Sequence, residues 1–362
     1  MGNAADHAFL APSDASRWVN CPGSALLQAQ FPEPEGDSVY AEEGTQAHGV
    51  AAEQLALSLA PALIPSGPEM AQAVGMYVTA VRAAHNNGKL HIEEQISVRS
   101  VHPDRCWGTC DLWWYDSAAD ILHVWDFKYG WGLVEARYNW QLLVYAAGIC
   151  ETVQAGQIML HIVQPRPYHP DGPHRTWTIT LADLMVLVAE RLAPAAELAT
   201  GENPPLQTGP HCRYCDALYY CPAAAQAVGH AVDVACTCAS PTLPPEQIGF
   251  ELSVLRRASE IITHRLAATE QTALSMIKGG TVIPGWTSGF TPGRKKWTDE
   301  AQVRAMAGMY GLDLNKPPEL ITPPQAINLG LPADVVKMYV TQEAGKAKLE
   351  PVNMDQIKQL LA

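Results

Sequence analysis

The stretch that decides the fold spans residues 108–128 and reads GTCDLWWYDSAADILHVWDFK. Two apolar segments flank the polar residues 116–120, and this pattern predicts an antiparallel hairpin. With the turn centred at 118–119, Asp111 lies directly opposite Asp126. Directly opposed Cβ atoms lie about 4.5–5.5 Å apart, and like charges in such a pair are destabilising. Two carboxylates so close among Trp and Leu side chains therefore need a cation.

Carboxylate oxygens of this kind suit Mg²⁺ or Mn²⁺. Period-2 alternation places Lys128 on the same face of the strand as Asp126. An Asp–Asp–Lys set around one divalent cation is suited to phosphodiester hydrolysis, because the cation activates water and the ammonium stabilises phosphate charge. The alternative is a solvated hairpin face on which these side chains are only surface charges.

Three further features lie outside the hairpin. Glu94, on the preceding predicted strand, can reach the same face; Glu93 is the adjacent alternative, because strand alternation does not settle which one points inward. Gln141 and Tyr145 are four residues apart and therefore share one face of the following predicted helix. His48, on an earlier predicted helix, can supply a nitrogen ligand.

In this order, these residues resemble the RecB-type branch of the PD-(D/E)XK nuclease superfamily. Its motifs are G-x-x-x-H, a Glu, G-x-x-D, D/E-x-K and Q-x-x-x-Y, and here they read GTQAH (44–48), Glu94, GTCD (108–111), DFK (126–128) and QLLVY (141–145). The resemblance implies metal binding by His48, Asp111, Asp126 and the Phe127 carbonyl. It also implies that Lys128 orients the attacking hydroxide, and that Glu94, Gln141 and Tyr145 complete the catalytic set.

The nine cysteines are the second chemical signal. The amino-terminal residues lack the pattern of an export signal, so we expect no disulfide framework. Cys212, Cys215 and Cys221 offer three thiolates within ten residues, and a tetrahedral metal site takes a fourth ligand. Cys21, far upstream, is the candidate for that position.

This layout resembles a nuclease subfamily represented by AddB and the CRISPR-associated adaptation nucleases. There, one cysteine before the nuclease core and three after it bind a [4Fe–4S] cluster. The resemblance implies that Cys21 and the later trio hold such a cluster, which joins the two ends of the domain. The alternatives are a zinc site, for which His211 is also available, and plain buried thiols. Cys236 and Cys238 are interpreted as packing residues.

The order of predicted elements indicates an α/β fold, a PD-(D/E)XK nuclease core with a mixed central sheet flanked by helices. We expect a loop-rich opening to residue 40, helices at 42–59, 69–85, 137–149 and 181–198, and strands at 91–98, 109–115, 121–129 and 157–164. Residues 1–239 form the predicted nuclease domain, with its core at about 42–200 and the cysteines at 212–221. Residues 240–362 form a smaller, mainly helical domain with a possible DNA-contacting role. It begins with a helix at 245–277 and continues with a short strand, a helix capped by Thr298, and helical pieces near Pro323 and Pro332.

Charge limits how the chain can contact nucleic acid. Twenty-four basic and 37 acidic residues give a net charge of −13, which excludes a coat-like binder of nucleic acid. Contact with DNA is therefore expected to be local. Trp131, in a Gly-Trp-Gly loop, is the best candidate for stacking on an unpaired base, and the basic run Arg294, Lys295 and Lys296 is a candidate for holding phosphates.

The expected function is a metal-dependent DNA exonuclease acting on single strands or DNA ends. The alternatives are a recombination accessory protein of the same fold that binds DNA and cuts slowly or not at all, and a redox sensor carrying the cluster. The chain has no phosphate-binding loop, and it has no apolar run long enough to span a membrane, so we expect a cytoplasmic protein without a motor of its own. The whole chain also resembles a phage and prophage family with a domain of unknown function, which implies a role in phage replication or recombination inside the bacterial host.

Overall fold

The computed structural model describes residues 8–31, 39–56, 67–167, 169, 171–236, 245–314, 323 and 331–351. The chain divides into two compact units, Met1–Leu266 and Ala267–Ala362. The predicted boundary at 239 lies earlier, before the long helix α9 (Pro245–Lys278), whereas the observed boundary falls inside that helix.

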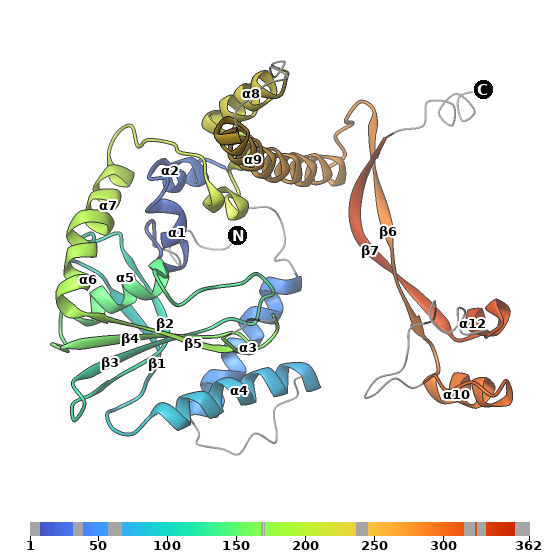
Figure 1. The fold of residues 1–362 in the computed structure, drawn as a ribbon, viewed down its shortest axis with the longest axis horizontal. Coiled ribbons are helices and arrows are strands. Elements are labelled where there is room, and N and C mark those ends of the chain that lie inside the picture. Colours follow the sequence, from blue (N-terminus) through green and yellow to red (C-terminus); the bar gives the residue numbers. More distant parts are fainter. Residues whose placement is uncertain are drawn as a thin grey trace. The chain divides into compact units, whose positions relative to one another are not determined.

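A five-stranded mixed sheet forms the centre of the first unit (Figure 1). Its strands follow the order of the chain: β1 (His91–Ser97), β2 (Trp107–Asp116), β3 (Ile121–Phe127), β4 (Gln157–Val163) and β5 (His174–Thr180). β3 and β4 are parallel, whereas the other neighbouring pairs are antiparallel. The parallel pair needs a crossover, and the helix between β3 and β4 provides it. The four predicted strands are confirmed, and β5 is an addition that the sequence analysis missed.

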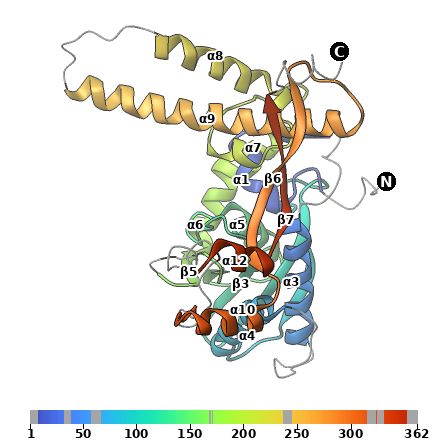
Figure 2. The same cartoon turned by 90° about the vertical axis from the view of Figure 1, so that its right-hand side faces the viewer.

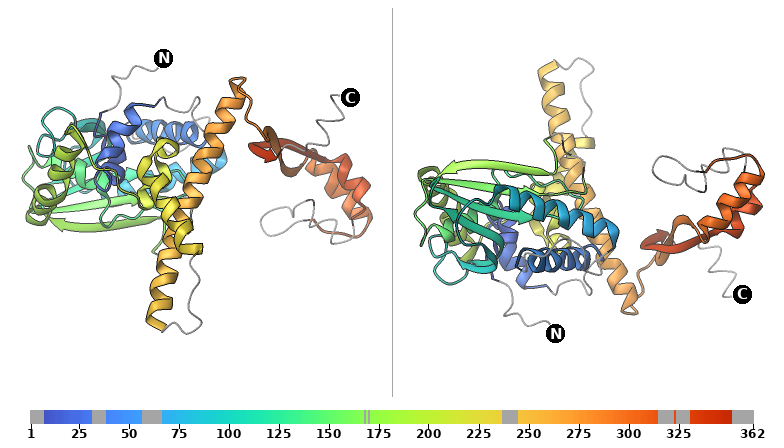
Figure 3. Two further views of the ribbon diagram at one scale, coloured as in Figure 1. Left: turned by 90° about the horizontal axis from the view of Figure 1, so that it is seen from above. Right: turned by 90° about the horizontal axis from the view of Figure 1, so that it is seen from below.

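Helices cover both faces of this sheet (Figures 1 and 3). One face carries α3 (Val39–Ala56) and α4 (Pro68–Ala84); the other carries α5 (Trp140–Ile149), α6 (Leu181–Leu187), the π-helical turn η2 (Val188–Leu192) and α7 (Ala193–Thr200). The single helix predicted at 181–198 is thus interrupted by η2. Pro194, at the start of α7, has no N–H to donate to the preceding turn, which accounts for the irregularity there.

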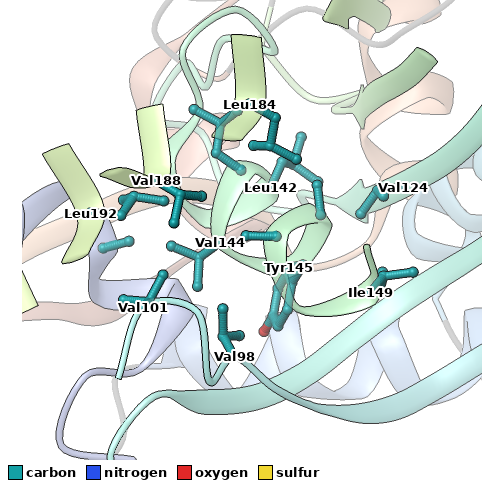
Figure 4. Packing of buried hydrophobic residues seen from close by; sticks show 14 of the residues in the cluster. Val98, Val101, Val124, Leu142, Val144, Tyr145, Ile149, Leu184, Val188 and Leu192 are labelled. Atoms are coloured by element: carbon teal, nitrogen blue, oxygen red, sulfur yellow. The ribbon is translucent and has the colours of Figure 1, made fainter. Parts of the chain in front are cut away.

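The larger hydrophobic core lies between the sheet and α5 (Figure 4). Leu142, Val144 and Tyr145 of α5 are buried in a cluster that also holds Leu184 of α6 and Val188 of η2. α5 approaches β1 so closely that a Cβ atom on Gly148 would lie 2.6 Å from Ile96 Cγ2. This close packing fixes the position of the helix face that carries Gln141 and Tyr145.

The amino-terminal segment is more ordered than predicted. Instead of a loop, residues 8–31 include η1 (Pro12–Asp14), α1 (Ala15–Trp18) and α2 (Gly23–Ala29). Trp18 is buried, and its indole N–H donates to the Ala11 carbonyl at 3.0 Å. These short helices escape hydrophobic-period analysis because each spans two turns or fewer.

After α7 the chain forms a cysteine-bearing segment and then two helices, α8 (Pro222–Cys236) and α9, which lie side by side (Figure 2). The cysteine-bearing segment contains the short helices η3 (Pro210–Tyr214) and η4 (Leu218–Tyr220). Arg265 of α9 donates to the carbonyls of Leu218 and Cys221, at 3.2 and 3.3 Å. The first part of α9 therefore packs against the cysteine-bearing segment and belongs to the first unit.

The described part of the second unit contains two long strands besides its helices, whereas the sequence predicted one short strand there. Two long antiparallel strands, β6 (Trp286–Trp297) and β7 (Val340–Pro351), accompany α10 (Glu300–Met309) and α12 (Ala333–Met338). Asp299, not Thr298, caps α10, because its side chain accepts from the backbone N–H of Gln302. The helix predicted near Pro332 is confirmed by α12, whereas nearly all the residues around Pro323 lie outside the described part. Among the described helices of the chain, none is long and apolar enough to cross a membrane.

Candidate functional site

The site begins where the pairing of β2 with β3 ends. Their pairing runs from Asp116–Ile121 to Leu112–Trp125, which confirms the predicted turn position. The next residues in this register are Asp111 and Asp126. β3 ends at Phe127, whereas β2 continues to Trp107 alongside β1, so the two carboxylates lie at the end of the β2–β3 pairing farthest from its turn.

Asp111 is held by donors from two other parts of the chain. Its Oδ2 accepts from the Phe127 backbone N–H at 2.7 Å and lies 3.3 Å from His48 Nδ1 of α3. Burial by itself would raise the pKa of Asp111, but His48, Lys128 and the Phe127 N–H together lower it below its usual value. Burial also opposes the charged form of His48, yet Asp111 outweighs this effect and raises the pKa of His48 to about 9.

Asp126 and Lys128 share one face of the chain, as the sequence predicts. Lys128 Nζ lies 3.0 Å from Asp126 Oδ1 and donates to Gln141 Oε1 of α5 at 2.9 Å. Burial, reinforced by the charge of Asp111, raises the pKa of Asp126 to about 6. Burial opposes the charge of Lys128, but Asp126 and Asp111 outweigh it, so the pKa of Lys128 is raised and the amine stays protonated at neutral pH.

Tyr145 of α5 holds β2 in place through a hydrogen bond to its backbone. Its hydroxyl donates to the Thr109 carbonyl at 2.6 Å, two residues before Asp111. A Cβ atom on Gly108 would lie 3.1 Å from this hydroxyl and 2.8 Å from Pro12 Cδ. The glycine therefore lets both groups approach the strand, and this accounts physically for the Gly three residues before Asp111.

Glu93, not Glu94, belongs to the site. β1 pairs Ile92 with Leu112 and Glu94 with Cys110, so Glu93 is left out of the ladder and bulges with a φ of 48°. The Glu94 carboxylate instead contacts the His91 ring. Burial and the charge of Asp111 raise the pKa of Glu93 to about 7. The structure therefore places Glu93, the adjacent alternative, at the site instead of Glu94, a choice that strand alternation did not settle.

Ligand atoms of His48, Glu93 and Asp111 all lie within 4.8 Å of one another. Beside them, Oδ2 of Asp126 is buried without a hydrogen-bond partner. An unpaired buried carboxylate oxygen is costly unless a cation satisfies it. The nitrogen and oxygen donors present here thus fit a divalent cation.

Tyr77 of α4 is a neighbour that sequence reasoning missed. It lines a small cavity together with His48, Glu93, Asp111 and Phe127. Its ring stacks on Phe127 at 4.8 Å, and its hydroxyl is buried without a partner. No sequence signal distinguished this Tyr from an ordinary core residue, because its role depends on how α4 packs against β3.

The four candidate cysteines come together although 190 residues of chain separate the first from the second. Burial raises the pKa of the Cys21 thiol, and the neighbouring thiols of Cys221 and Cys212 raise it further. Burial raises the pKa of Cys215 to about 11, with smaller contributions from Cys212 and Cys21. Cys21 Sγ accepts from the Gln207 N–H at 3.3 Å, and Cys212 Sγ accepts from the Gly209 N–H at 3.4 Å.

The spacing of these sulfurs is wider than that of the His48 group. Within the described part of the chain, no three of the four cysteine sulfurs form a set whose members all lie within 4.8 Å of one another. His211, the alternative zinc ligand, makes a 2.9 Å hydrogen bond from Nε2 to the Gln207 carbonyl oxygen. Cys236 ends α8, and Cys238 lies outside the described residues.

The predicted nucleic-acid contacts lie in different units. Trp131 follows Lys128 closely and is 57% exposed. Arg294, Lys295 and Lys296 belong to β6 of the second unit, and their side chains lie outside the described part of the structure.

Fold and site together define an α/β protein whose mixed sheet ends at a buried group of acidic, histidine and lysine side chains. The chain belongs to the family described as "Protein of unknown function (DUF2800)", which matches residues 7–355. Among solved structures, one described as "Crystal structure of SSO0001" is similar at 16% identity over 62% of this chain and 89% of that chain, with a TM-score of 0.29. A TM-score this low carries no argument about function.

Proposed function

We propose that this protein is a Mg²⁺- or Mn²⁺-dependent deoxyribonuclease of the RecB-type PD-(D/E)XK class, which hydrolyses phosphodiester bonds in single strands or at DNA ends. One observation carries the proposal. The buried Oδ2 of Asp126 has no partner, while the ammonium of Lys128 is held at Oδ1 of the same carboxylate. A cation site and a phosphate-stabilising charge thus meet at one residue.

The residues that would hold the cation are Asp111 and Asp126, with His48, Glu93 and the Phe127 carbonyl around them. A divalent cation in this position supplies Lewis acidity, which polarises the phosphate and makes a water molecule more acidic. His48 and Glu93 hold protons readily in the metal-free protein, so these protons leave as the cation binds.

Lys128 supplies the positive charge that stabilises the phosphate. Its raised pKa keeps the amine protonated, so it acts as a hydrogen-bond donor to the attacking water and the scissile phosphate rather than as a general base. Gln141 fixes the position of this ammonium from α5. Tyr145 is a positioning residue, because its hydrogen bond to the Thr109 carbonyl holds the strand that presents Asp111.

The second part of the proposal is a structural [4Fe–4S] cluster held by Cys21, Cys212, Cys215 and Cys221. Two of the sulfurs accept backbone N–H groups, which are interactions that stabilise cluster-bound thiolates. A tetrahedral zinc site with Zn–S bonds of about 2.3 Å would hold its sulfurs about 3.8 Å apart. Within the described residues no three of these sulfurs form so compact a set, so the proposal of a cluster rests on the cysteine pattern and on these N–H contacts.

The setting of this activity is proposed to be phage replication or recombination in the bacterial cytoplasm. Partners in that setting would be other phage replication or recombination proteins. The net charge of −13 supports local contacts with a strand rather than extended coating of DNA.

The test is digestion of end-labelled linear and closed-circular single strands with Mg²⁺ or Mn²⁺ by anaerobically purified protein. Wild type should degrade the linear strand and leave the circle intact. Asp126→Asn should abolish cleavage, because the amide cannot replace a carboxylate at the cation. The matched control is Asp116→Asn, which alters a buried aspartate at the turn end of β2.

Cleavage of the linear strand by Asp126→Asn at the wild-type rate would overturn the assignment. Binding of DNA without cleavage by any metal-loaded form would replace it with the accessory-protein alternative.

A further inference from the structure

The loop after β3 is rigid although it lies at the surface. Gln164 is fully buried, and its side-chain amide donates to the carbonyls of Gly130 and Gly132 at 3.0 and 2.7 Å. Its side-chain oxygen accepts from the Val134 N–H at 3.1 Å and from Arg175 at 2.8 Å. One buried side chain therefore fixes the loop backbone on both sides of Trp131.

This rigid loop nevertheless leaves the Trp131 indole largely in solvent, with 57% of the residue exposed. The Arg166 guanidinium lies 5.4 Å from its ring centroid. A large apolar ring that a fixed backbone holds in water contributes little to the core, and it loses little conformational entropy when a ligand binds. Packing of the protein itself does not explain the position of this side chain.

A second exposed aromatic residue reaches the same loop from the cysteine-bearing segment. Tyr214, between Cys212 and Cys215, is 64% exposed, and its hydroxyl would lie only 2.9 Å from a Cβ atom placed on Gly132. Its carbonyl accepts from Arg17 at 2.7 Å. Tyr214 is thus held beside the residue that follows Trp131, although more than 80 residues of chain separate the two rings.

Positive charge accompanies this pair of rings. The guanidinium of Arg213, an exposed residue, lies 5.2 Å from the Tyr214 ring centroid. Lys128 precedes the loop by two residues. In a chain with a net charge of −13, cations beside two exposed rings match the two parts of a nucleotide, a phosphate and a planar base.

We propose that Trp131 and Tyr214 form a stacking subsite for the unpaired bases of a single strand that enters or leaves the site at Lys128. The inference deepens the proposed nuclease function and rests on it, because it assigns single-stranded nucleic acid as the substrate class. It also gives the cysteine-bearing segment a role in binding, since that segment carries one of the two rings.

The test measures binding of a short fluorescent oligothymidylate by anisotropy in EDTA, so that no cleavage is needed. Trp131→Ala and Tyr214→Ala should each weaken binding roughly 5- to 150-fold, the range for loss of one stacked base. Trp131→Phe and Tyr214→Phe keep a ring and should retain most of the affinity. Leu133→Ala, which removes an equally exposed apolar residue of the same loop, is the matched control and should bind as wild type does.

The base is distinguished from the backbone by a strand of abasic residues, to which wild type and the Ala variants should bind equally. An oligouridylate arm shows whether the subsite prefers DNA to RNA. Wild-type affinity for oligothymidylate in both Ala variants, or an equal loss toward the abasic strand, would overturn the inference. Ring-dependent binding without hydrolysis would overturn the nuclease proposal alone, whereas hydrolysis with ring-independent binding would overturn this inference alone.

Discussion

Lys128 Nζ lies 3.0 Å from Oδ1 of Asp126, while Oδ2 of the same carboxylate is buried with no partner. One side of this carboxylate is therefore neutralised by a cation of the chain, and the other side is left without a hydrogen-bond partner. This asymmetry underlies the separate roles proposed for the two sides, metal binding at Oδ2 and water orientation at Lys128.

Removing the ammonium should separate hydrolysis from binding. Lys128→Ala should reduce kcat by about 10²- to 10³-fold, because it deletes a donor to the transition state, and should leave Mn²⁺ affinity within a few fold. Gln141→Ala should cost less, since it only frees the ammonium that remains. Single-turnover cleavage and Mn²⁺ titration measure the two effects, and an unchanged kcat in Lys128→Ala would contradict the assigned role.

The two adjacent glutamates provide a matched pair. Glu93→Gln should weaken Mn²⁺ binding by at least about tenfold, because its carboxylate lies with His48 and Asp111. Glu94→Gln should bind Mn²⁺ as wild type does, because Glu94 contacts His91 instead. Isothermal titration of both variants measures this difference, and the reverse order of effects would mean that the bulge at Glu93 does not form.

Cation affinity should rise with pH. In the metal-free protein, Asp111 raises the pKa of His48 to about 9, and burial raises the pKa of Glu93 to about 7, so protons compete with the cation below these values. Mn²⁺ affinity should therefore increase from pH 6 to pH 9, with proton release seen as a buffer-dependent binding enthalpy. His48→Gln should bind more weakly, and its affinity should level off above about pH 7. A pH-independent wild-type affinity would contradict a site built on these groups.

A row of three histidines should make the fold sensitive to acid. His161 lies 3.0 Å from both His123 and His174 through its two ring nitrogens, and its ring stacks on Trp125 at 3.8 Å. Burial lowers the pKa of all three histidines. The unfolded chain takes up these protons below about pH 6.5 while the folded chain does not, so this contribution to stability is present above pH 6.5 and is lost as the pH falls.

The raised pKa values of Glu93 and Asp126 act in the opposite sense, since both groups favour the folded state as they become protonated. The quantity to compare is therefore the change in unfolding free energy between pH 7 and pH 5 in variant and wild type. This loss should be smaller in His161→Leu, although that variant is less stable at pH 7. The exposed His230→Gln should leave the pH dependence as in wild type, and an unchanged dependence in His161→Leu would rule out the buried row as its source.

The cysteine group should matter more to stability than to chemistry. Cys21→Ser and Cys215→Ser should give colourless, easily proteolysed protein, because the group closes a long loop between the two ends of the first unit. Cys150→Ser, at a buried core thiol, should remain brown and bind iron. Iron and zinc contents decide the matter: about one zinc and no iron would replace the cluster with a zinc site, and unchanged iron in Cys21→Ser would remove that residue as a ligand.

Local pattern was sufficient for the hairpin and for most of the site. The alternation of apolar residues and the polar turn predicted the pairing that leads to Asp111 and Asp126, and the same alternation placed Lys128 beside Asp126. These predictions hold because backbone geometry alone relates residues two apart in a strand or opposite one another across a short turn.

Tertiary structure decided which of two similar neighbouring residues enters the site, and which distant segments come into contact. Glu93 and Glu94 are chemically identical, and only the bulge at φ 48° selects the first. Likewise, nothing in the spacing brings Tyr214 to Gly132, or Cys21 to the later cysteines. These contacts depend on how helices and loops pack over the sheet. Contacts between distant segments arise from the burial of whole surfaces, and a repeat within one element does not predict them.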